Sequence, residues 1–130
     1  MVNSQQEIVL DDTSLLVSET DSTGKIIYAN DTFLEISEYQ LDELIGHPHS
    51  LVRHPDMPKA AFKDLWETIK RGDVWEGFVK NYTKTKKFYW VYATIFPYSK
   101  DHYLSVRKMA TRDEIEKYEK IYTQMRKEER

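Results

Sequence analysis

Residues 15–33, LLVSETDSTGKIIYANDTF, decide the fold class of this chain. Runs of β-branched and apolar residues predict two strands, over Leu15–Thr20 and Lys25–Ala29. The four residues between them suit a hairpin turn, because Gly24 can adopt a positive φ at no steric cost. Asn30 or Asp31 then caps a short helix. The stretch therefore predicts a hairpin that passes directly into a helix.

Further helical segments follow before the next strands. Leu41–Ile45 predicts one turn that Gly46 ends. Three of the four prolines fall in 47–58, which predicts an ordered loop or single turns. A longer helix is expected to open at Asp56 or Met57 and to end at Gly72. Its apolar residues follow the spacing i, i+3, i+4, i+7: Phe62, Leu65, Trp66 and Ile69.

The C-terminal half predicts three strands and one helix. The strands are expected over Val74–Tyr82, Phe88–Pro97 and Tyr103–Met109. Thr111 and Glu114 form a capping box, which predicts a final helix from that point. The apolar stripe of that helix has the spacing of a short coiled-coil seam and consists of Ile115, Tyr118, Tyr122 and Met125. The order predicts an α+β domain with a five-stranded antiparallel sheet, short helices on one face and a ligand cavity between them.

Composition excludes several classes of function. The 130 residues suit one domain, and the net charge of −3 argues against a nucleic-acid partner. The absence of cysteine excludes disulfides, thiolate metal sites and cysteine nucleophiles. No apolar run approaches the roughly 20 residues that cross a bilayer, so no membrane insertion is expected. No nucleophile elbow, phosphate-binding glycine loop or spaced carboxylate pair predicts catalysis, so the chain is not expected to be an enzyme.

Five segments resemble the PAS domains of the aerotaxis and redox-sensing type. They cover residues 28–33, 46–49 running into 52–58, 62–66, 79–81 followed by 89–91, and 105–107. The string Arg53–Pro58 is the most specific of them, and the match runs from about residue 13 to residue 122. The resemblance implies a PAS fold, bound flavin adenine dinucleotide (FAD) and a redox or oxygen signal passed to a chemotaxis partner. Such a partner is a chemoreceptor or a histidine-kinase signalling protein.

The resemblance also implies which residues contact or retain the flavin. Carried over motif by motif, they are Asn30, His49, Arg53, His54, Asp56, Trp66, Asn81 and Arg107. Six of these residues also have a simpler structural interpretation. Trp66 lies on the apolar stripe of its helix and suits a plain core. Asn81 and Arg107 could face solvent, Asp56 could cap the helix, and Arg53 and His54 could tie the loop down.

The sequence departs from the family pattern in three places. Glu38 stands where the family usually has glycine, and the hairpin 82–87 lacks the usual glycine. The loop 98–102 is short and also lacks glycine. The two loop changes affect the geometry of those turns. Glu38 lies nearer the pocket helices, so its change bears on the ligand assignment.

Other functions stay open on the residues alone. One of His47, His49 and His54 could be an axial haem ligand in a gas sensor. His47 and His49, together with His54 or Asp56, could instead hold a metal ion. A ligand-free PAS module for interaction or homodimerisation would use the aromatic residues as plain core. The expected division is an N-terminal cap over 1–12, a sensor domain over 13–110 and a connector helix over 111–130. The chain is expected to be cytoplasmic, either free or associated with a membrane-bound receptor.

Overall fold

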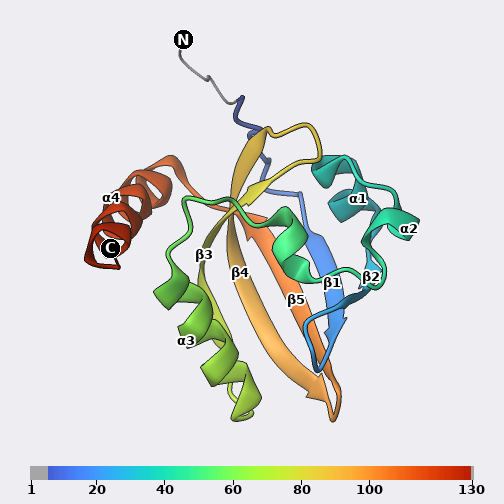
Figure 1. Cartoon of the computed structure of the whole chain (residues 1–130). Coiled ribbons are helices and arrows are strands. Elements are labelled where there is room, and N and C mark those ends of the chain that lie inside the picture. Colours follow the sequence, from blue (N-terminus) through green and yellow to red (C-terminus); the bar gives the residue numbers. More distant parts are fainter. Residues whose placement is uncertain (1–5, 130) are drawn as a thin grey trace.

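The predicted hairpin is present in the computed structural model, which describes residues 6–129 (Figure 1). Strand β1 (Leu16–Asp21) pairs antiparallel with β2 (Ile26–Ala29). Gly24 has a φ of 89° in the turn between them, as expected from its lack of a Cβ atom. The Asn30 side chain caps helix α1 (Asp31–Ser37) by accepting a hydrogen bond from Phe33 N. The local signals of this stretch are therefore confirmed.

Three further helical elements lead to the second group of strands. Helix α2 (Leu41–Leu44) and the 3-10 helix η1 (His49–Val52) are single turns, in agreement with the proline-rich sequence. Helix α3 (Lys59–Lys70) is longer and buries Ala61, Leu65, Thr68 and Ile69. The expectation that Asp56 caps this helix is wrong. Pro58 occupies the N-cap position, and the Asp56 carboxylate instead pairs with Lys80.

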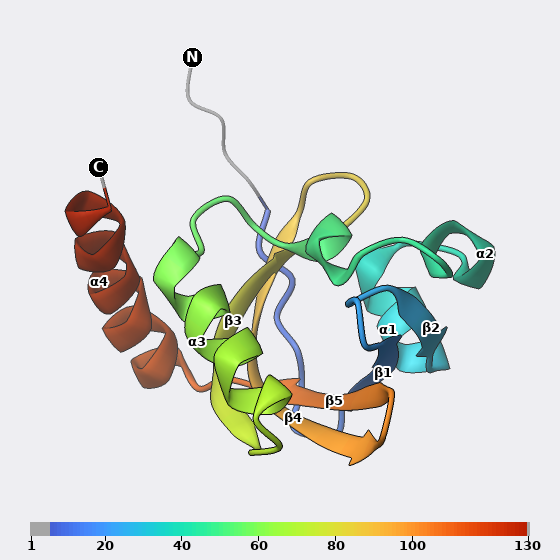
Figure 2. The ribbon, with the colours of Figure 1, turned by 60° about the horizontal axis from the view of Figure 1, so that its bottom comes forward.

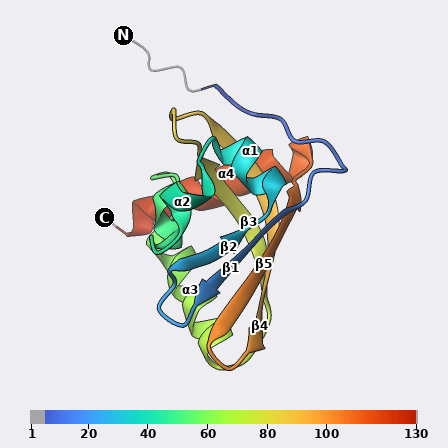
Figure 3. The same ribbon diagram turned by 90° about the vertical axis from the view of Figure 1, so that its right-hand side faces the viewer.

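All five strands join one antiparallel sheet in the order β2-β1-β5-β4-β3, with β3 (Trp75–Tyr82), β4 (Phe88–Ser99) and β5 (His102–Met109). Figure 3 shows β2 and β1 beside β5. Figure 2 shows α1 and α2 near the β1–β2 side and α3 near β3 and β4. The first described residues pair with β4, since Ile8 N donates to Phe88 O at 2.8 Å. Residues 1–5 of the expected N-terminal cap lie outside the described residues.

Helix α4 (Arg112–Glu128) begins with the predicted capping box and packs on the sheet face opposite α3. Phe78 contacts Tyr118, and Trp90 stacks on Tyr122 at 6.1 Å. Both sheet residues belong to the face that alternates with Val79, which faces α3. The hydroxyl of Tyr122 also donates to Phe78 O at 2.6 Å. The predicted apolar seam of α4 thus packs against the sheet.

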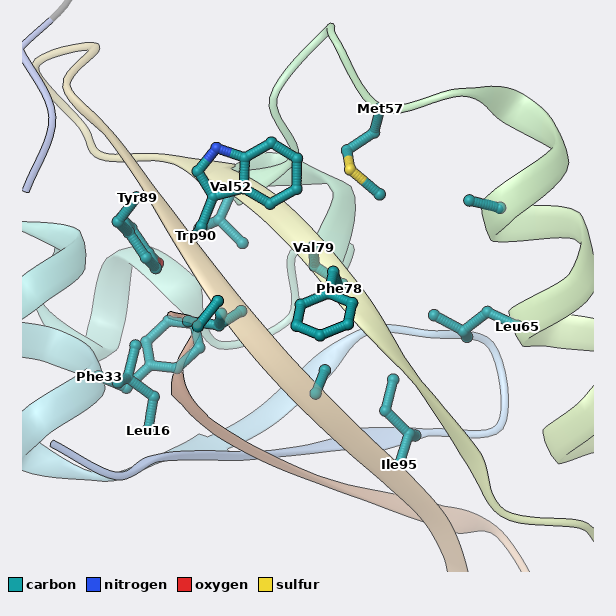
Figure 4. Close-up of a cluster of buried hydrophobic side chains, with 14 of the residues drawn as sticks. Leu16, Phe33, Val52, Met57, Leu65, Phe78, Val79, Tyr89, Trp90 and Ile95 are labelled. Atoms are coloured by element: carbon teal, nitrogen blue, oxygen red, sulfur yellow. The ribbon is translucent and has the colours of Figure 1, made fainter. Parts of the chain in front are cut away.

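The core lies between the sheet and the helices that cover it (Figure 4). Its most enclosed side chains are apolar or aromatic: Leu16, Ile26, Phe33, Leu44, Val52, Tyr89 and Val91. Leu16 and Phe33 meet at one end of the cluster, and Leu65 of α3 lies at the other. Fully burying one such side chain stabilises a fold by about 1.5–3 kcal/mol. The cluster holds α3 across the sheet, and the two enclose a cavity.

Candidate functional site: a polar and aromatic cavity between α3 and the sheet

A cavity of about 230 Å³ lies between helix α3 and the sheet face that it covers. Residues from four regions line it. The principal ones are Phe62, Leu65 and Trp66 on α3, His49 and Arg53 near η1, Gly24 in the first turn, and Val79, Asn81, Ile95, Tyr103, Ser105 and Arg107 on the sheet. The cavity therefore has an aromatic and aliphatic side on α3 and a polar side on the strands. Such a mixed lining is typical of small-molecule sites.

Trp66 forms the flat part of the α3 side. Its ring lies edge-on to Tyr103 at 5.8 Å, and both residues line the cavity. A Cβ atom added to Gly24 would lie 2.9 Å from the Trp66 ring, so only glycine admits the ring at this place. Gly24 therefore serves the turn and the cavity together. Trp66 of α3 and Asn81 of β3 thus line the same cavity.

Five buried side-chain polar groups on the sheet lack a hydrogen-bond partner among residues 6–129, and three of them line the cavity. These three are Asn81 Nδ2, Ser105 Oγ and Arg107 Nε. A buried polar group that lacks a partner costs roughly 1–3 kcal/mol. A ligand in the cavity can satisfy all three. Two of the three are pure hydrogen-bond donors, which indicates a ligand edge that is rich in acceptors.

Ser18, His49 and Arg107 form a connected polar group beside the cavity. Arg107 Nη1 donates to Ser18 Oγ at 3.2 Å, and Ser18 Oγ lies 3.0 Å from His49 Nε2. Ser18 Oγ has two lone pairs and one hydrogen, so while it accepts from Arg107 it can either donate to His49 Nε2 or accept from it, depending on the tautomer of the ring. The imidazole is thereby held by one strand while it faces the cavity.

Arg107 and His49 of this group differ in charge at pH 7. Removal from water lowers the pKa of His49 well below its usual value, and the nearby Arg107 charge adds to the effect. His49 is therefore neutral at pH 7. Burial also lowers the pKa of Arg107, to about 10, so that its guanidinium stays charged at pH 7. No carboxylate among the described residues pairs with Arg107, and this unpaired buried cation favours a ligand with negative charge or strong acceptors.

Arg53 lies at the mouth of the cavity. Its guanidinium stacks over the ring of Phe62 at 3.6 Å, and its side chain remains exposed. Its backbone forms a bridge to Asn81 of β3, so the loop before α3 is tied to the polar side of the cavity. In the described part of the chain, Arg53 has no carboxylate partner. It can therefore bind an anionic group that extends out of the cavity.

The structure brings five of the eight predicted residues to this cavity and leaves three outside it. His49, Arg53, Trp66, Asn81 and Arg107 line the cavity. Asn30 caps α1 and binds the backbone of β1, since its Oδ1 accepts from Val17 N at 3.1 Å and its Nδ2 donates to Leu15 O at 3.0 Å. His54 and Asp56 lie on the outer side of β3. The prediction of flavin contact at those three positions stays a prediction, and any effect there would be exerted through the loop and strand that they hold.

The His54–Asp56 pair is organised around Lys80. Lys80 Nζ donates to Asp56 Oδ2 at 2.8 Å, and His54 Nδ1 accepts from Asp56 N at 2.9 Å. Burial raises the pKa of Asp56, but the hydrogen bond and charge of Lys80 outweigh that effect and lower it. Burial and the Lys80 charge lower the pKa of His54 to about 4. The buried Lys80 cation is thus paired, whereas Arg107 is not.

Comparison with known proteins identifies the family. The sequence profile of the PAS fold matches residues 26–111. The chain belongs to the PAS family. This PAS domain is 47% identical to the aerotaxis receptor of Escherichia coli (strain K12) over 123 residues, which are 92% of the chain and 24% of the receptor. It is 32% identical over 87 residues to the biofilm dispersion protein BdlA of Pseudomonas aeruginosa, which is 66% of the chain and 21% of that protein.

This PAS domain therefore spans about a quarter or less of the length of these relatives. Among solved structures, the dark structure of the blue-light photoreceptor aureochrome 1 LOV domain superposes with a TM-score of 0.69 at 20% identity. That match covers 88% of this chain and 86% of the other and shows the shared fold.

Two serines at the PAS cavity were not predicted from the sequence: Ser105 lines it, and Ser18 lies beside it. Ser18 and Ser105 face each other across β1 and β5, and both lie on the inner face. The available signal is strand alternation, because Ser18 stands two residues after the buried Leu16. A polar residue at an inward position indicates a site. The pairing of the two serines depends on the register of distant strands, which the sequence does not reveal.

Residues 6–129 contain neither a candidate metal site nor a helix that could span a membrane. No group of three or more histidine, cysteine, aspartate or glutamate side chains is placed to hold a metal ion there. His47 is exposed while His49 binds Ser18, so these two neighbouring histidines do not converge. None of the helices in this part of the chain has the length and apolar character needed to span a membrane.

Proposed function

We propose that this PAS domain is a redox or oxygen sensor that holds FAD in the cavity under α3. The observation that carries the proposal is the set of three buried polar groups, on Asn81, Ser105 and Arg107, that lack partners and line the cavity. The edge of a flavin ring is rich in carbonyl and nitrogen acceptors, which matches these donors. Trp66 adds an aromatic surface on the opposite wall.

The size of the cavity is consistent with a ring that is enclosed and a tail that is not. Its volume of about 230 Å³ is below the roughly 300–1,000 Å³ of sites that enclose a whole drug-sized ligand. The remainder of a dinucleotide has to pass the mouth, where Arg53 offers an exposed guanidinium to a pyrophosphate. This position of Arg53 supports FAD over a flavin without the second phosphate.

The residues of this chain can respond to the redox state of a bound ring. FAD would supply reversible oxidation and reduction. Asn81 can present either its amide N–H or its carbonyl, so it can bind a ring edge that accepts or one that donates. Arg107 stabilises the more negative ligand state, because it is buried, charged and free of a carboxylate. A change of ligand state therefore alters the contacts of β3 and β5 together.

We further propose that the signal passes to a chemoreceptor or histidine-kinase signalling partner in the cytoplasm. The similarity to the aerotaxis receptor over 92% of the chain supports this class of partner. The sheet and helix α4 are the elements that a partner can contact, since α4 packs directly behind β3 and β4. No catalytic step is part of the proposal, and the domain acts by binding.

One experiment tests the cofactor. The visible spectrum of freshly purified protein is expected to show the paired bands of a flavin, and mass spectrometry of the released ligand is expected to identify FAD. A Soret band would replace the proposal with a haem sensor. Absence of any band, with no binding of FAD or FMN added to the protein, would overturn the proposal in favour of a ligand-free interaction module.

A further inference from the structure

The C-terminal end of α4, with its C-cap residue Glu129, reaches around the edge strand β3 and holds the start of α3. Glu129 Oε1 accepts from Lys59 N at 3.0 Å, and Oε2 accepts from Ala60 N at 2.8 Å. Arg126 Nη1 donates to the backbone carbonyl of Asp56. Arg126 of the last turn of α4 and the C-cap residue Glu129 therefore bind the segment 56–60 by its backbone.

Helix α3 depends on this contact because its own sequence supplies no cap. Its N-cap residue, Pro58, has no side-chain acceptor, and its first turn contains no acidic residue. The first four N–H groups of a helix lack partners within the helix, and a negative charge near them is favourable. Glu129 provides the acceptors and the charge from 69 residues further along the chain.

The segment that α4 holds is the outer support of the cavity. It lies between Arg53 at the mouth and the α3 residues Phe62 and Trp66 on the wall. Its other side is joined to β3, because His54 N donates to Lys80 O at 3.2 Å and Lys80 Nζ binds Asp56. Lys80 is followed by Asn81, which faces the cavity. Movement of segment 56–60 therefore acts on both walls.

We propose that Glu129 and Arg126 are positioning residues of the ligand site, so that docking of α4 and occupancy of the cavity favour each other. This inference rests on the proposed function for the identity of the ligand. Coupling between two sites is reciprocal: a ligand that needs the held position of α3 also strengthens the attachment of α4. A ligand state that shifts segment 56–60 releases the last turn of α4, which gives the sensor a defined output contact.

Glu129→Ala tests the proposal, with Glu128→Ala as the matched control. Glu128 is the preceding residue, and its carboxylate accepts from Gln124 within α4 itself. We expect Glu129→Ala to weaken FAD binding by about 5-fold or more, at the lower end of ordinary coupling, and to speed hydrogen exchange at Lys59 and Ala60. Glu129→Gln keeps one acceptor oxygen and should restore part of both effects. FAD should slow exchange in the last turn of α4 in the parent protein.

The outcomes separate the two proposals. If exchange at Lys59 and Ala60 increases in Glu129→Ala while FAD affinity equals that of the control, the cap is only structural and the inference is overturned. If the parent binds no flavin, the proposed function fails, and the inference is then judged in the ligand-free protein. In that case the NMR signals of the Asn81 side-chain amide and the Trp66 indole N–H should shift in Glu129→Ala and not in the control. Unchanged signals would overturn it.

Discussion

Glu38 and Thr85 lie 47 residues apart and share two hydrogen bonds, from the amide and the hydroxyl of Thr85 to Glu38 Oε1. Lys87 Nζ lies 3.1 Å from the other carboxylate oxygen. Glu38 has a φ of 69° and Lys86 a φ of 70°, both in the region that favours glycine. The two departures from the family pattern are therefore linked. A left-handed residue costs roughly 1–2 kcal/mol, and the hydrogen bonds to a charged carboxylate offset this cost.

The first prediction concerns this contact and its dependence on pH. Hydrogen bonds from Thr85 and Thr83 lower the pKa of Glu38 to about 2, from 4.5. A carboxyl whose pKa is lower in the folded state adds stability above pH 4.5, and this stability is lost as pH falls towards 2. Glu38→Gln should lower the free energy of unfolding by about 1 kcal/mol at pH 7. The difference from the parent should shrink between pH 4.5 and 2.

Denaturant unfolding at a series of pH values measures this difference. Glu35→Gln is the control, because Glu35 is exposed on the same helix α1. A constant difference between the parent and Glu38→Gln down to pH 2 would contradict the assignment.

Local signals in the sequence predicted much of the fold, and long-range contacts explain what they missed. Gly24, Asn30 and the Thr111–Glu114 box act on neighbouring residues, so their roles follow from short stretches of sequence. Asp56 was misplaced as a cap, because the pairing with Lys80 competes for its carboxylate and lies 24 residues away. The distant cap from Glu129 had no local signal at all.

The candidate site was also predictable only in part. Trp66 and Asn81 were assigned to the flavin site by resemblance, and both line the same cavity. The unpaired state of Arg107 depends on which carboxylates fold close to it, and no stretch of sequence specifies that.

Arg107→Met is expected to have opposite effects on the fold and on ligand binding. Replacing an unpaired buried charge by an apolar side chain of similar length should raise the free energy of unfolding of the ligand-free protein by about 1 kcal/mol. FAD binding should weaken by roughly 10-fold or more, since a charged hydrogen bond is lost. Unfolding of ligand-free protein and FAD titration measure the two effects. Lys108→Met is the control, because Lys108 is exposed on the opposite face of β5, and it should change neither the free energy of unfolding nor the FAD affinity by a comparable amount. A less stable Arg107→Met protein with unchanged FAD affinity would refute the role of Arg107 in ligand binding.

Trp66→Phe is expected to keep the fold and to weaken flavin retention. Phenylalanine fills most of the volume next to Gly24 but offers a smaller face to the cavity. The fraction of purified protein that carries flavin measures the effect. Trp75→Phe is the control, because Trp75 is buried beside α3, bonds Asp64 at 2.9 Å and does not line the cavity. Equal flavin content in the two variants would show that Trp66 has no specific role in flavin retention.

Asn81→Ala should change the flavin and leave the fold almost unaffected. The Asn81 amide nitrogen is buried without a partner among residues 6–129, so its removal costs the ligand-free protein little. The retained flavin should show a shifted midpoint potential, measured by redox titration, or a faster rate of loss. An unchanged potential together with unchanged retention would show that the amide does not touch the ring.

The final prediction concerns the pH dependence that His54 gives to the fold. His54 is buried, its ring packs on Tyr82 at 4.2 Å, and its Nδ1 accepts from Asp56 N. Burial and the charges of Lys80 and Arg126 oppose protonation and outweigh Asp56, so the pKa falls from 6.5 to about 4. Between pH 6.5 and 4, His54 is therefore protonated in the unfolded chain and still neutral in the folded chain. His54 adds stability above pH 6.5 that is lost as pH falls through this window.

Two measurements check it. The ring proton signals of His54 in NMR should titrate with a midpoint near 4. His54→Asn places an amide oxygen near the position of Nδ1, so it can keep the bond from Asp56 N while removing the titration. Because the lowered pKa of His49 acts in the same direction, the variant isolates the share of His54: its unfolding free energy should fall less steeply than that of the parent between pH 6.5 and 4. A midpoint near 6.5, or identical slopes, would show that protonated His54 is tolerated beside Lys80.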